Sequence, residues 1–196
     1  MKASIPYYEE NGAVFVEGSV HADMSGAYAH FLPRLPAGAR ILDLGCGSGR
    51  DSLAFLRRGY RVVSADGSSA MCAYAQELTG QEVLCLRFEE LDFRAEFDGV
   101  WACASLLHVG KSEMPGVLQR VARALKPGGI AYLSYKYGTE ERESGGRSFS
   151  DYTERDLPDL LPPALGLELQ EYWITQDVRP EREERWLNVI AEKEKS

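Results

Sequence analysis

The sequence predicts a doubly wound α/β fold with a seven-stranded, mostly parallel sheet and helices on both faces. Apolar runs alternate with amphipathic segments along the 196 residues, which is the element order of a parallel sheet with crossover helices. A glycine-rich turn at residues 45–49 joins the first apolar run to the next amphipathic segment. The last two apolar runs follow one another without a helical segment between them.

Seven strands are predicted from the apolar runs and the glycine, proline and polar residues that bound them. They are Arg40–Leu44, Arg61–Ala65, Glu82–Leu86, Gly99–Cys103, Gly129–Tyr135, Glu168–Ile174 and Arg185–Ala191. The first five belong to successive strand–helix units and are expected to run parallel. Residues 175–184 alone separate the last two strands, so we expect an antiparallel hairpin at the sheet edge.

Five helices are predicted from apolar residues at three- and four-residue spacing. They are Ala22–Leu32, Asp51–Arg58, Ser69–Leu78, Lys111–Leu125 and Thr153–Leu161. The fourth is the clearest, and the sequence KPGG at 126–129 ends it, as glycine and proline after a helix C-terminus do. We expect one domain over residues 1–196, with residues 1–36 as a helical cap over the site and residues 138–150 as a lid loop.

Composition and charge restrict the classes of partner. The chain has 22 basic and 30 acidic residues, a net charge of −8, which argues against the basic stripe of a nucleic-acid-binding protein. No apolar run reaches the roughly 20 residues of a membrane span, and the N-terminus lacks the apolar core of a signal peptide. Four cysteines without a CxxC pair are typical of reduced thiols. We expect a cytoplasmic protein, monomer or homodimer, with a small-molecule partner, no nucleic acid, no membrane and no metal.

The glycine turn and one acidic residue predict an adenosine-containing cofactor. Ligands of open α/β sheets bind beyond the carboxyl ends of the strands, and both features lie there. Gly45, Gly47 and Gly49 alternate with other residues after the first strand, so a ligand can lie directly on the main chain. Asp66 follows the second strand, where a carboxylate can accept hydrogen bonds from both ribose hydroxyls.

These motifs, over residues 39–135, resemble those of class I S-adenosylmethionine-dependent methyltransferases. The similar segments are DLGCGSG at 43–49, Asp66, LRFEELDF at 86–93, FDGVW at 97–101 and LKPGG at 125–129. The resemblance implies a Rossmann-like sheet of strand order 3-2-1-4-5-7-6, strand 7 antiparallel, and S-adenosylmethionine as methyl donor with S-adenosylhomocysteine as product. A nicotinamide enzyme is disfavoured because its fingerprint is G-x-G-x-x-G. The segments GRDS at 49–52, SLLHV at 105–109 and WLN at 186–188 are similar to small bacterial, tellurite-resistance-like members.

The resemblance implies a set of cofactor contacts. They are Tyr8, Asp43, Gly45, Cys46, Gly47, Arg50, Asp66, Gly67, Met71, Phe88, Glu89 and Ala102. The turn at 45–47 is expected beneath the methionine and ribose, and Phe88 and Glu89 at the adenine. Asp43 either orders the turn or reaches the cofactor's amino group through water. Met71 either lines the adenine side or belongs to the core.

The acceptor side is predicted from residues beyond the carboxyl ends of the later strands. His108 is the candidate general base, and the alternative is that it caps the following loop. Candidate substrate contacts are Ser105, Lys136, Arg147, Trp186 and Asn188. Lys136 and Arg147 either neutralise an anionic substrate group or are solvated loop charges. The sequence ACAS at 102–105 stands where base-modifying methyltransferases carry N/D-P-P-Y/F.

The favoured function is therefore in-line methyl transfer to a small-molecule acceptor. Two other functions stay open at this point. One is a different use of the same cofactor, such as cyclisation or transfer of another alkyl group. The other is a cofactor-binding module without catalysis.

Overall fold

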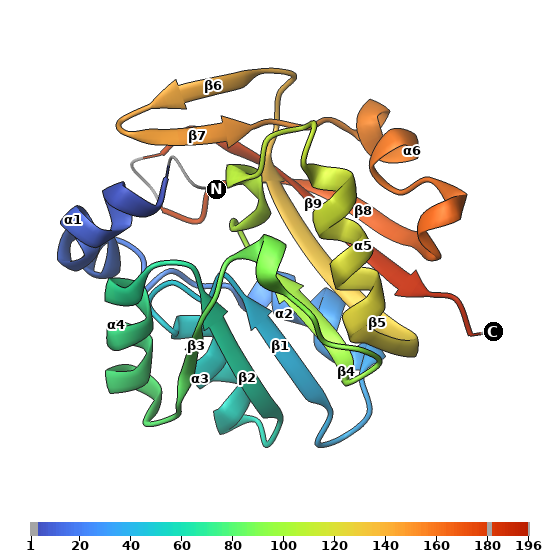
Figure 1. Cartoon of the computed structure of the whole chain (residues 1–196), viewed down its shortest axis with the longest axis horizontal. Helices are drawn as coiled ribbons and strands as arrows, with labels where there is room; N and C mark the ends of the chain where they lie inside the picture. Colours follow the sequence, from blue (N-terminus) through green and yellow to red (C-terminus); the bar gives the residue numbers. More distant parts are fainter. Residues whose placement is uncertain (1–3, 180–181, 196) are drawn as a thin grey trace.

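The computed structural model describes residues 4–179 and 182–195 and contains a seven-stranded sheet of order β3-β2-β1-β4-β5-β9-β8 (Figure 1). Its strands are β1 (Arg40–Leu44), β2 (Arg61–Asp66), β3 (Val83–Cys85), β4 (Phe97–Ala102), β5 (Leu125–Lys136), β8 (Leu167–Gln176) and β9 (Arg185–Lys193). Neighbouring strands are parallel except at β9, which is antiparallel to both β5 and β8. The predicted strand order and edge hairpin are confirmed.

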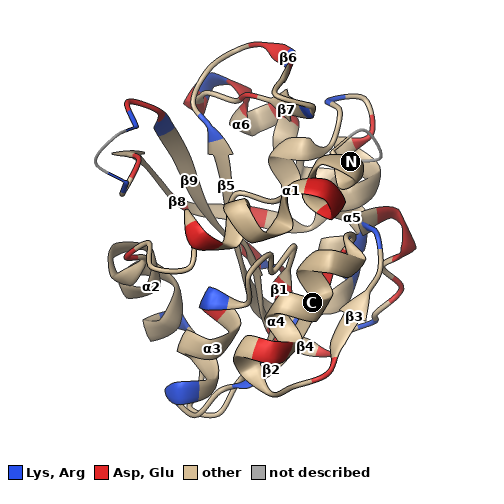
Figure 2. Ribbon diagram, turned by 90° about the vertical axis from the view of Figure 1, so that its left-hand side faces the viewer, with Lys and Arg blue, Asp and Glu red and all other residues tan. Residues whose placement is uncertain are grey.

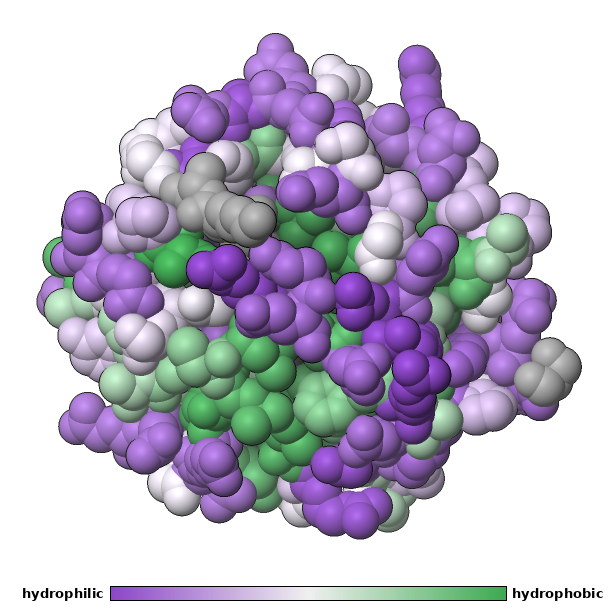
Figure 3. Space-filling model, in the orientation of Figure 1, coloured by the Kyte–Doolittle hydropathy of each residue, from purple (hydrophilic) through white to green (hydrophobic). Residues whose placement is uncertain are grey.

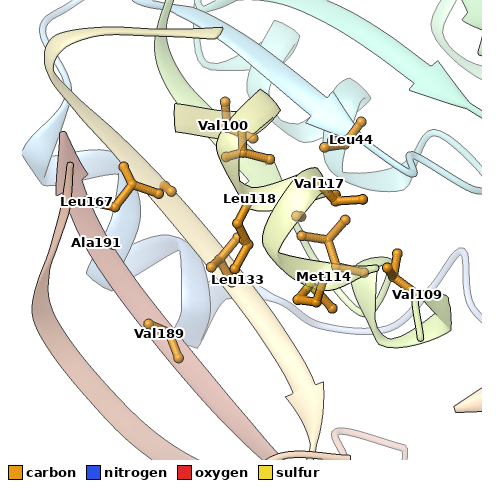
Figure 4. Close-up of a cluster of buried hydrophobic side chains, with 14 of the residues drawn as sticks. Leu44, Val100, Val109, Met114, Val117, Leu118, Leu133, Leu167, Val189 and Ala191 are labelled. Atoms are coloured by element: carbon orange, nitrogen blue, oxygen red, sulfur yellow. The ribbon is translucent and has the colours of Figure 1, made fainter. Parts of the chain in front are cut away.

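Helices pack on both faces of this sheet. On one face lie α2 (Ser25–Phe31), α3 (Arg50–Arg57) and α4 (Ser69–Thr79), and on the other lie α5 (Met114–Ala124) and the short α6 (Leu157–Leu160). The apolar stripe of α5 is buried in one cluster with residues of β4, β5 and β9 (Figure 4). The predicted helix was too long at both ends, since Pro115 stands in the first turn of α5 and Leu125 begins β5.

Aromatic side chains fill the space between the strands β1, β4 and β5 and the helices α2 and α3. Trp101 and Tyr132 are stacked with ring centroids 3.9 Å apart. Phe31 and Phe55 contact the indole of Trp101 from α2 and α3. All four side chains are fully buried, so α2 and α3 are fixed firmly against the sheet.

Two elements near the site differ from the predicted outline. Residues 5–17 form α1 (Ile5–Glu17), which is kinked at Asn11; Asn11 and Gly12 interrupt its apolar spacing, while Pro6 in the first turn is a helix-start signal. Residues 138–150, expected as a loop, contain a hairpin of β6 (Glu141–Ser144) and β7 (Arg147–Ser150). Its turn is Gly145-Gly146, both with positive φ, which suits a two-residue hairpin connection.

The connection between β3 and β4 has no α-helix, in agreement with the predicted helices, none of which lies between residues 86 and 99. Only a short 3-10 turn, Phe88–Glu90, interrupts it. Four apolar side chains pack against the core there but stay partly exposed, namely Val63, Leu84, Leu86 and Phe93. Figure 3 shows apolar side chains gathered over this part of the face. None of the helices in the described part of the chain is long and apolar enough to cross a membrane.

Candidate functional site

A cavity of about 410 Å³ lies beyond the carboxyl ends of the parallel strands. This volume is within the range of roughly 300–1,000 Å³ that is typical of small-molecule and cofactor pockets. Its wall includes residues of α1, the β6–β7 hairpin and the β8–β9 connection. Acidic and basic residues are interspersed on that hairpin and connection, as Figure 2 shows.

The glycine turn forms one end of the cavity wall. The backbone N–H groups of Gly45 and Cys46 donate to the Ala65 carbonyl at 2.8 and 3.0 Å, which ties the turn to the end of β2. Gly45 and Gly47 have φ of +78° and +52°, where other residues are strained. A Cβ on Gly45 would also lie 2.3 Å from the Ser105 Cβ. The turn therefore needs glycine for its backbone angles and for its close approach to the end of β4.

Asp66 joins this turn to the start of α4. One carboxylate oxygen accepts the Gly47 N–H at 2.9 Å and the other accepts the Ser68 N–H at 2.9 Å. Burial raises the pKa of Asp66, and these backbone N–H groups act in the opposite direction. Each oxygen retains a lone pair that can accept a further hydrogen bond. Beside it on the wall lie the buried side chains of Met71 and Phe88, which are apolar surfaces suited to a nucleobase.

The structure divides the predicted cofactor contacts into two groups. On the cavity wall are Tyr8, Gly45, Cys46, Gly47, Arg50, Asp66, Met71 and Phe88, whereas Asp43, Gly67, Glu89 and Ala102 do not line it. The buried Asp43 carboxylate accepts a hydrogen bond from the Ser52 hydroxyl at 2.6 Å. Burial and the nearby Asp51 charge raise the pKa of Asp43. Of the two roles left open for Asp43, this geometry favours ordering the junction of β1 and α3.

Arg50 is held by its neighbour Asp51. Its guanidinium makes two hydrogen bonds to the Asp51 carboxylate, at 2.7 and 2.8 Å. Asp51 also accepts the Tyr28 hydroxyl at 2.6 Å and the Trp101 indole N–H at 2.8 Å. Burial alone would raise the pKa of Asp51, but the Arg50 charge and these hydrogen bonds lower it below its ordinary value. The charge of Arg50 is therefore compensated within the protein.

His108 lies in the 3-10 turn after β4 and is buried. Its Nδ1 is 2.7 Å from the Ser148 carbonyl oxygen and its Nε2 is 2.8 Å from the Tyr8 hydroxyl. A carbonyl can only accept, so this hydrogen-bond arrangement assigns the ring proton to Nδ1 and leaves Nε2 to accept the Tyr8 proton. Burial lowers the pKa of His108 to about 4, with further lowering by Arg147 and Lys136. The imidazole is thus neutral, and its basic nitrogen is engaged by Tyr8.

Acid should destabilise the protein through His108. Because the folded-state pKa is about 4 and the ordinary value is 6.5, the unfolded chain binds the proton more tightly. Stability is therefore fully present above about pH 6.5 and is lost as the pH falls toward 4. Linkage gives a loss of about 2 kcal/mol between pH 7 and pH 5. Urea unfolding of His108→Gln at both pH values should show this difference reduced by that amount.

His21 offers the matched control, since its side chain is exposed. His21→Gln should leave the difference between pH 7 and pH 5 as it is in the unmodified protein. An equal effect of both substitutions would contradict the burial argument.

All five predicted acceptor-side residues line the cavity, yet most are tied to the protein. The Ser105 hydroxyl donates to the Leu44 carbonyl at 2.6 Å, and the Asn188 carbonyl oxygen accepts the Tyr132 hydroxyl at 2.7 Å. Lys136 pairs with Glu184, and the Trp186 indole N–H donates to Asp177 at 3.2 Å. Sequence left open which of residues 186 and 187 faces the core; Leu187 is fully buried there, while Trp186 borders the cavity.

Several wall residues were not predicted. They are Phe15 and Ser19 of the N-terminal segment, Phe149 of the hairpin, and Asp177 and Arg179 after β8. For Phe149, the Gly-Gly pair between alternating residues was a usable hairpin signal. For the N-terminal residues there was no such signal, because their contacts depend on how α1 docks. The connection at 175–184 between the last two predicted strands includes Pro180 and Glu181, which lie outside the described residues.

Comparison with known proteins agrees with this architecture. Residues 41–129 match a family described as a methyltransferase domain. The structure of 1,6-didemethyltoxoflavin-N1-methyltransferase from Burkholderia thailandensis, solved with 1,6-didemethyltoxoflavin and S-adenosylhomocysteine, superposes with a TM-score of 0.78 and 25% identity, covering 98% of this chain and 87% of that one. Residues 41–129 therefore carry a methyltransferase domain, and the chain as a whole has the fold of class I S-adenosylmethionine-dependent methyltransferases.

Two further relatives show how much of the chain is similar to known proteins. Over 103 residues, 50% of this chain, it is 36% identical to a ubiquinone biosynthesis O-methyltransferase of Bradyrhizobium sp. (strain ORS 278) and spans only 40% of that relative's length. A TehB-like S-adenosylmethionine-dependent methyltransferase from Corynebacterium glutamicum shares the fold with a TM-score of 0.70 and 20% identity, covering 96% of this chain and 100% of that one.

S-adenosylmethionine, the cofactor of this family, fits the residues present. The glycine turn at 45–47 leaves main chain open to the cavity, Asp66 offers acceptors for ribose hydroxyls, and Met71 and Phe88 supply apolar walls. The turn, Asp66 and Phe88 lie at or just after the carboxyl ends of β1, β2 and β3, which the parallel sheet places side by side, and Met71 lies in the first turn of α4.

Proposed function

We propose that this protein transfers a methyl group from S-adenosylmethionine to a small-molecule acceptor. The observation that carries the proposal is a single cavity with two chemically different halves. One half holds the glycine turn, Asp66 and the apolar walls, and the other holds Tyr8, His108 and aromatic and charged side chains. A donor in the first half and an acceptor in the second would meet inside one enclosed space.

In this proposal the cofactor half fixes the donor. Asp66 accepts hydrogen bonds from the ribose, Met71 and Phe88 enclose the adenine, and the 45–47 turn lies against the methionine part. When bound, S-adenosylmethionine supplies a methyl group that an acceptor atom can displace from sulfur. Such a displacement is accelerated mainly by alignment and by exclusion of water, and α1 and the β6–β7 hairpin, which contribute to the cavity wall, serve that purpose.

His108 is the proposed proton acceptor, and Tyr8 connects it to the acceptor. The Tyr8 hydroxyl donates to His108 Nε2, so its oxygen can accept an O–H or N–H from a substrate. As the methyl group is transferred, the substrate proton would pass to Tyr8 while the Tyr8 proton passes to His108. The Ser148 carbonyl, which accepts the Nδ1–H, would stabilise the resulting imidazolium.

Substitution of His108 should separate this role from cofactor binding. Loss of a positioned general base costs about 10²–10⁴ in rate, so His108→Gln is expected to lower kcat by at least about 10². The affinity for S-adenosylhomocysteine should stay within about twofold, since His108 lies in the other half of the cavity. Tyr8→Phe should reproduce the loss in kcat, and an unaltered rate in both variants would remove the pair from the mechanism.

Methyl transfer itself can be tested without knowing the acceptor. A metabolite extract is incubated with the protein and with S-adenosylmethionine labelled in the methyl group, and the labelled product is isolated. The expected result is one labelled metabolite together with S-adenosylhomocysteine. Formation of methylthioadenosine would indicate another use of the cofactor, and absence of calorimetric binding of S-adenosylhomocysteine at millimolar concentration would sink the proposal.

A further inference from the structure

The basic side chains on the cavity wall differ in one respect, which is whether a carboxylate compensates them. Arg50 pairs with Asp51, Lys136 with Glu184, Arg142 with Asp151, Arg179 with Asp177 and Arg182 with Glu184. Arg147 has no ion-pair partner among residues 4–179 and 182–195. Its Nε is moreover buried without a hydrogen-bond partner in that part of the chain. Lys136 and Arg182 share the Glu184 carboxylate, whereas Arg147 is the basic residue of the acceptor half that has no carboxylate beside it in that part of the chain.

The Arg147 side chain is held by aromatic rings. Its guanidinium carbon lies 4.3 Å from the ring centroid of Tyr7 and 5.3 Å from that of Phe149. Contacts of this type cover the flat faces of a guanidinium and leave its N–H edge for hydrogen bonds. The charge of Arg147 also reaches the Tyr8 hydroxyl, where it lowers a pKa that burial raises by more. A fixed and partly desolvated arginine thus stands beside the atom that we assign to the substrate proton.

We propose that the methyl acceptor carries a single carboxylate group, that Arg147 binds this group, and that the accepting O–H or N–H lies against Tyr8. This inference rests on the proposed methyl transfer and adds the substrate class. A guanidinium edge matches the two oxygens of a carboxylate. Arg147 supplies one positive charge to the bound group, so a dianion such as a phosphate monoester would keep a second negative charge that Arg147 does not neutralise, which is costly away from water.

Binding of a carboxylate would also change the surroundings of His108. The Arg147 and Lys136 charges disfavour a proton on that imidazole, and Lys136 is already compensated by Glu184. A carboxylate on Arg147 would offset the Arg147 charge. The proton acceptor would then become more basic only when a substrate is in place.

A binding experiment tests the carboxylate site independently of turnover. The protein is saturated with S-adenosylhomocysteine, and the binding of benzoate, benzamide and phenyl phosphate is followed by saturation-transfer NMR. We expect binding of benzoate at millimolar concentration, at least tenfold weaker binding of the other two, and a loss of at least tenfold for benzoate in R147Q. R147K should retain part of the affinity, because it keeps the charge without the planar edge.

Arg155 gives the matched control, since it is exposed and lies outside the cavity wall. R155Q should bind benzoate as the unmodified protein does. Benzoate binding that is absent, equal in R147Q, or weaker than that of phenyl phosphate would overturn the proposal. A tenfold loss of S-adenosylhomocysteine affinity in R147Q would also overturn it, because Arg147 would then bind the carboxylate of the cofactor.

The labelled product from the metabolite extract supplies the second readout. Under this proposal the labelled product carries a carboxylate, which esterification followed by mass spectrometry detects whether or not the molecule also carries an amine. Labelling of an acceptor without a carboxylate would contradict the inference while supporting methyl transfer. Absence of any labelled product together with Arg147-dependent benzoate binding would contradict methyl transfer and leave the carboxylate site standing.

Discussion

Replacement of Asp51 by alanine is expected to lower the free energy of unfolding by about 3–5 kcal/mol, the usual cost of removing one partner of a buried ion pair. Asp51 is 6% exposed and accepts hydrogen bonds from Arg50, Tyr28 and Trp101. Alanine would leave a buried guanidinium, a hydroxyl and an indole N–H without this acceptor. Because a domain of this size has a total stability of about 5–15 kcal/mol, urea unfolding should show a large shift of the midpoint.

Two further variants test whether the ion pair is the cause of this loss of stability. Glu96 pairs with Arg40 at 2.9 Å where both side chains are more than a third exposed, so Glu96→Ala should cost only about 0–1 kcal/mol. The double variant Arg50→Ala/Asp51→Ala should lose less than the sum of the single variants, because the two residues interact directly. Additive losses would mean that the ion pair is not the origin of the effect.

Replacement of Asp66 by asparagine is expected to weaken S-adenosylhomocysteine binding by about 1.5–3 kcal/mol, or roughly 10- to 150-fold, which is the range for losing hydrogen bonds to a charged group. Asparagine keeps the size of the side chain but replaces one carboxylate oxygen by a donor. Where that donor faces the Gly47 or the Ser68 N–H, the hydrogen bond is lost, and the neutral amide binds a ribose hydroxyl more weakly than the carboxylate does. Isothermal calorimetry measures the change in affinity directly.

Asp92 is the control for this substitution, because it is an exposed aspartate remote from the cavity wall. Asp92→Asn should leave the affinity unchanged within about twofold. Thermal unfolding of both variants without ligand shows whether the Asp66 variant remains folded. A folded Asp66→Asn protein of normal affinity would remove this carboxylate from the cofactor site.

The parallel part of the fold was predictable because each element carries its own local signal. The apolar spacing of residues 114–121 and the KPGG that follows define α5 and the start of β5, and the short 175–184 connection defines the edge hairpin. The extra hairpin at 141–150 and the kinked α1 were less legible, since both consist of polar and aromatic residues with weak periodicity. Their position depends on packing over the cavity, which a local pattern does not encode.

The candidate site shows the same difference between residues placed by a local sequence signal and residues placed by packing. Gly45, Gly47 and Asp66 follow strands directly, so their place at the sheet edge follows from topology. His108 was also found this way, but its pairing with Tyr8 joins residues 100 positions apart. The distinction between Arg147 and the ion-paired Lys136 could not be predicted either, because Glu184 reaches Lys136 through the antiparallel pairing of β9 with β5.

The hydrogen bonds of His108 tie together segments distant in the chain. Tyr8 belongs to α1, Ser148 belongs to β7, and the Ser4 hydroxyl lies 3.0 Å from the Ser148 N–H and 3.4 Å from His108 Nδ1. If the hairpin moved away, the imidazole would lose the carbonyl that selects its tautomer. If α1 moved away, the imidazole would lose its link to the acceptor. Under the proposed mechanism, the same docking of α1 and the β6–β7 hairpin therefore completes the cavity wall and holds His108 in the tautomer that can accept a proton.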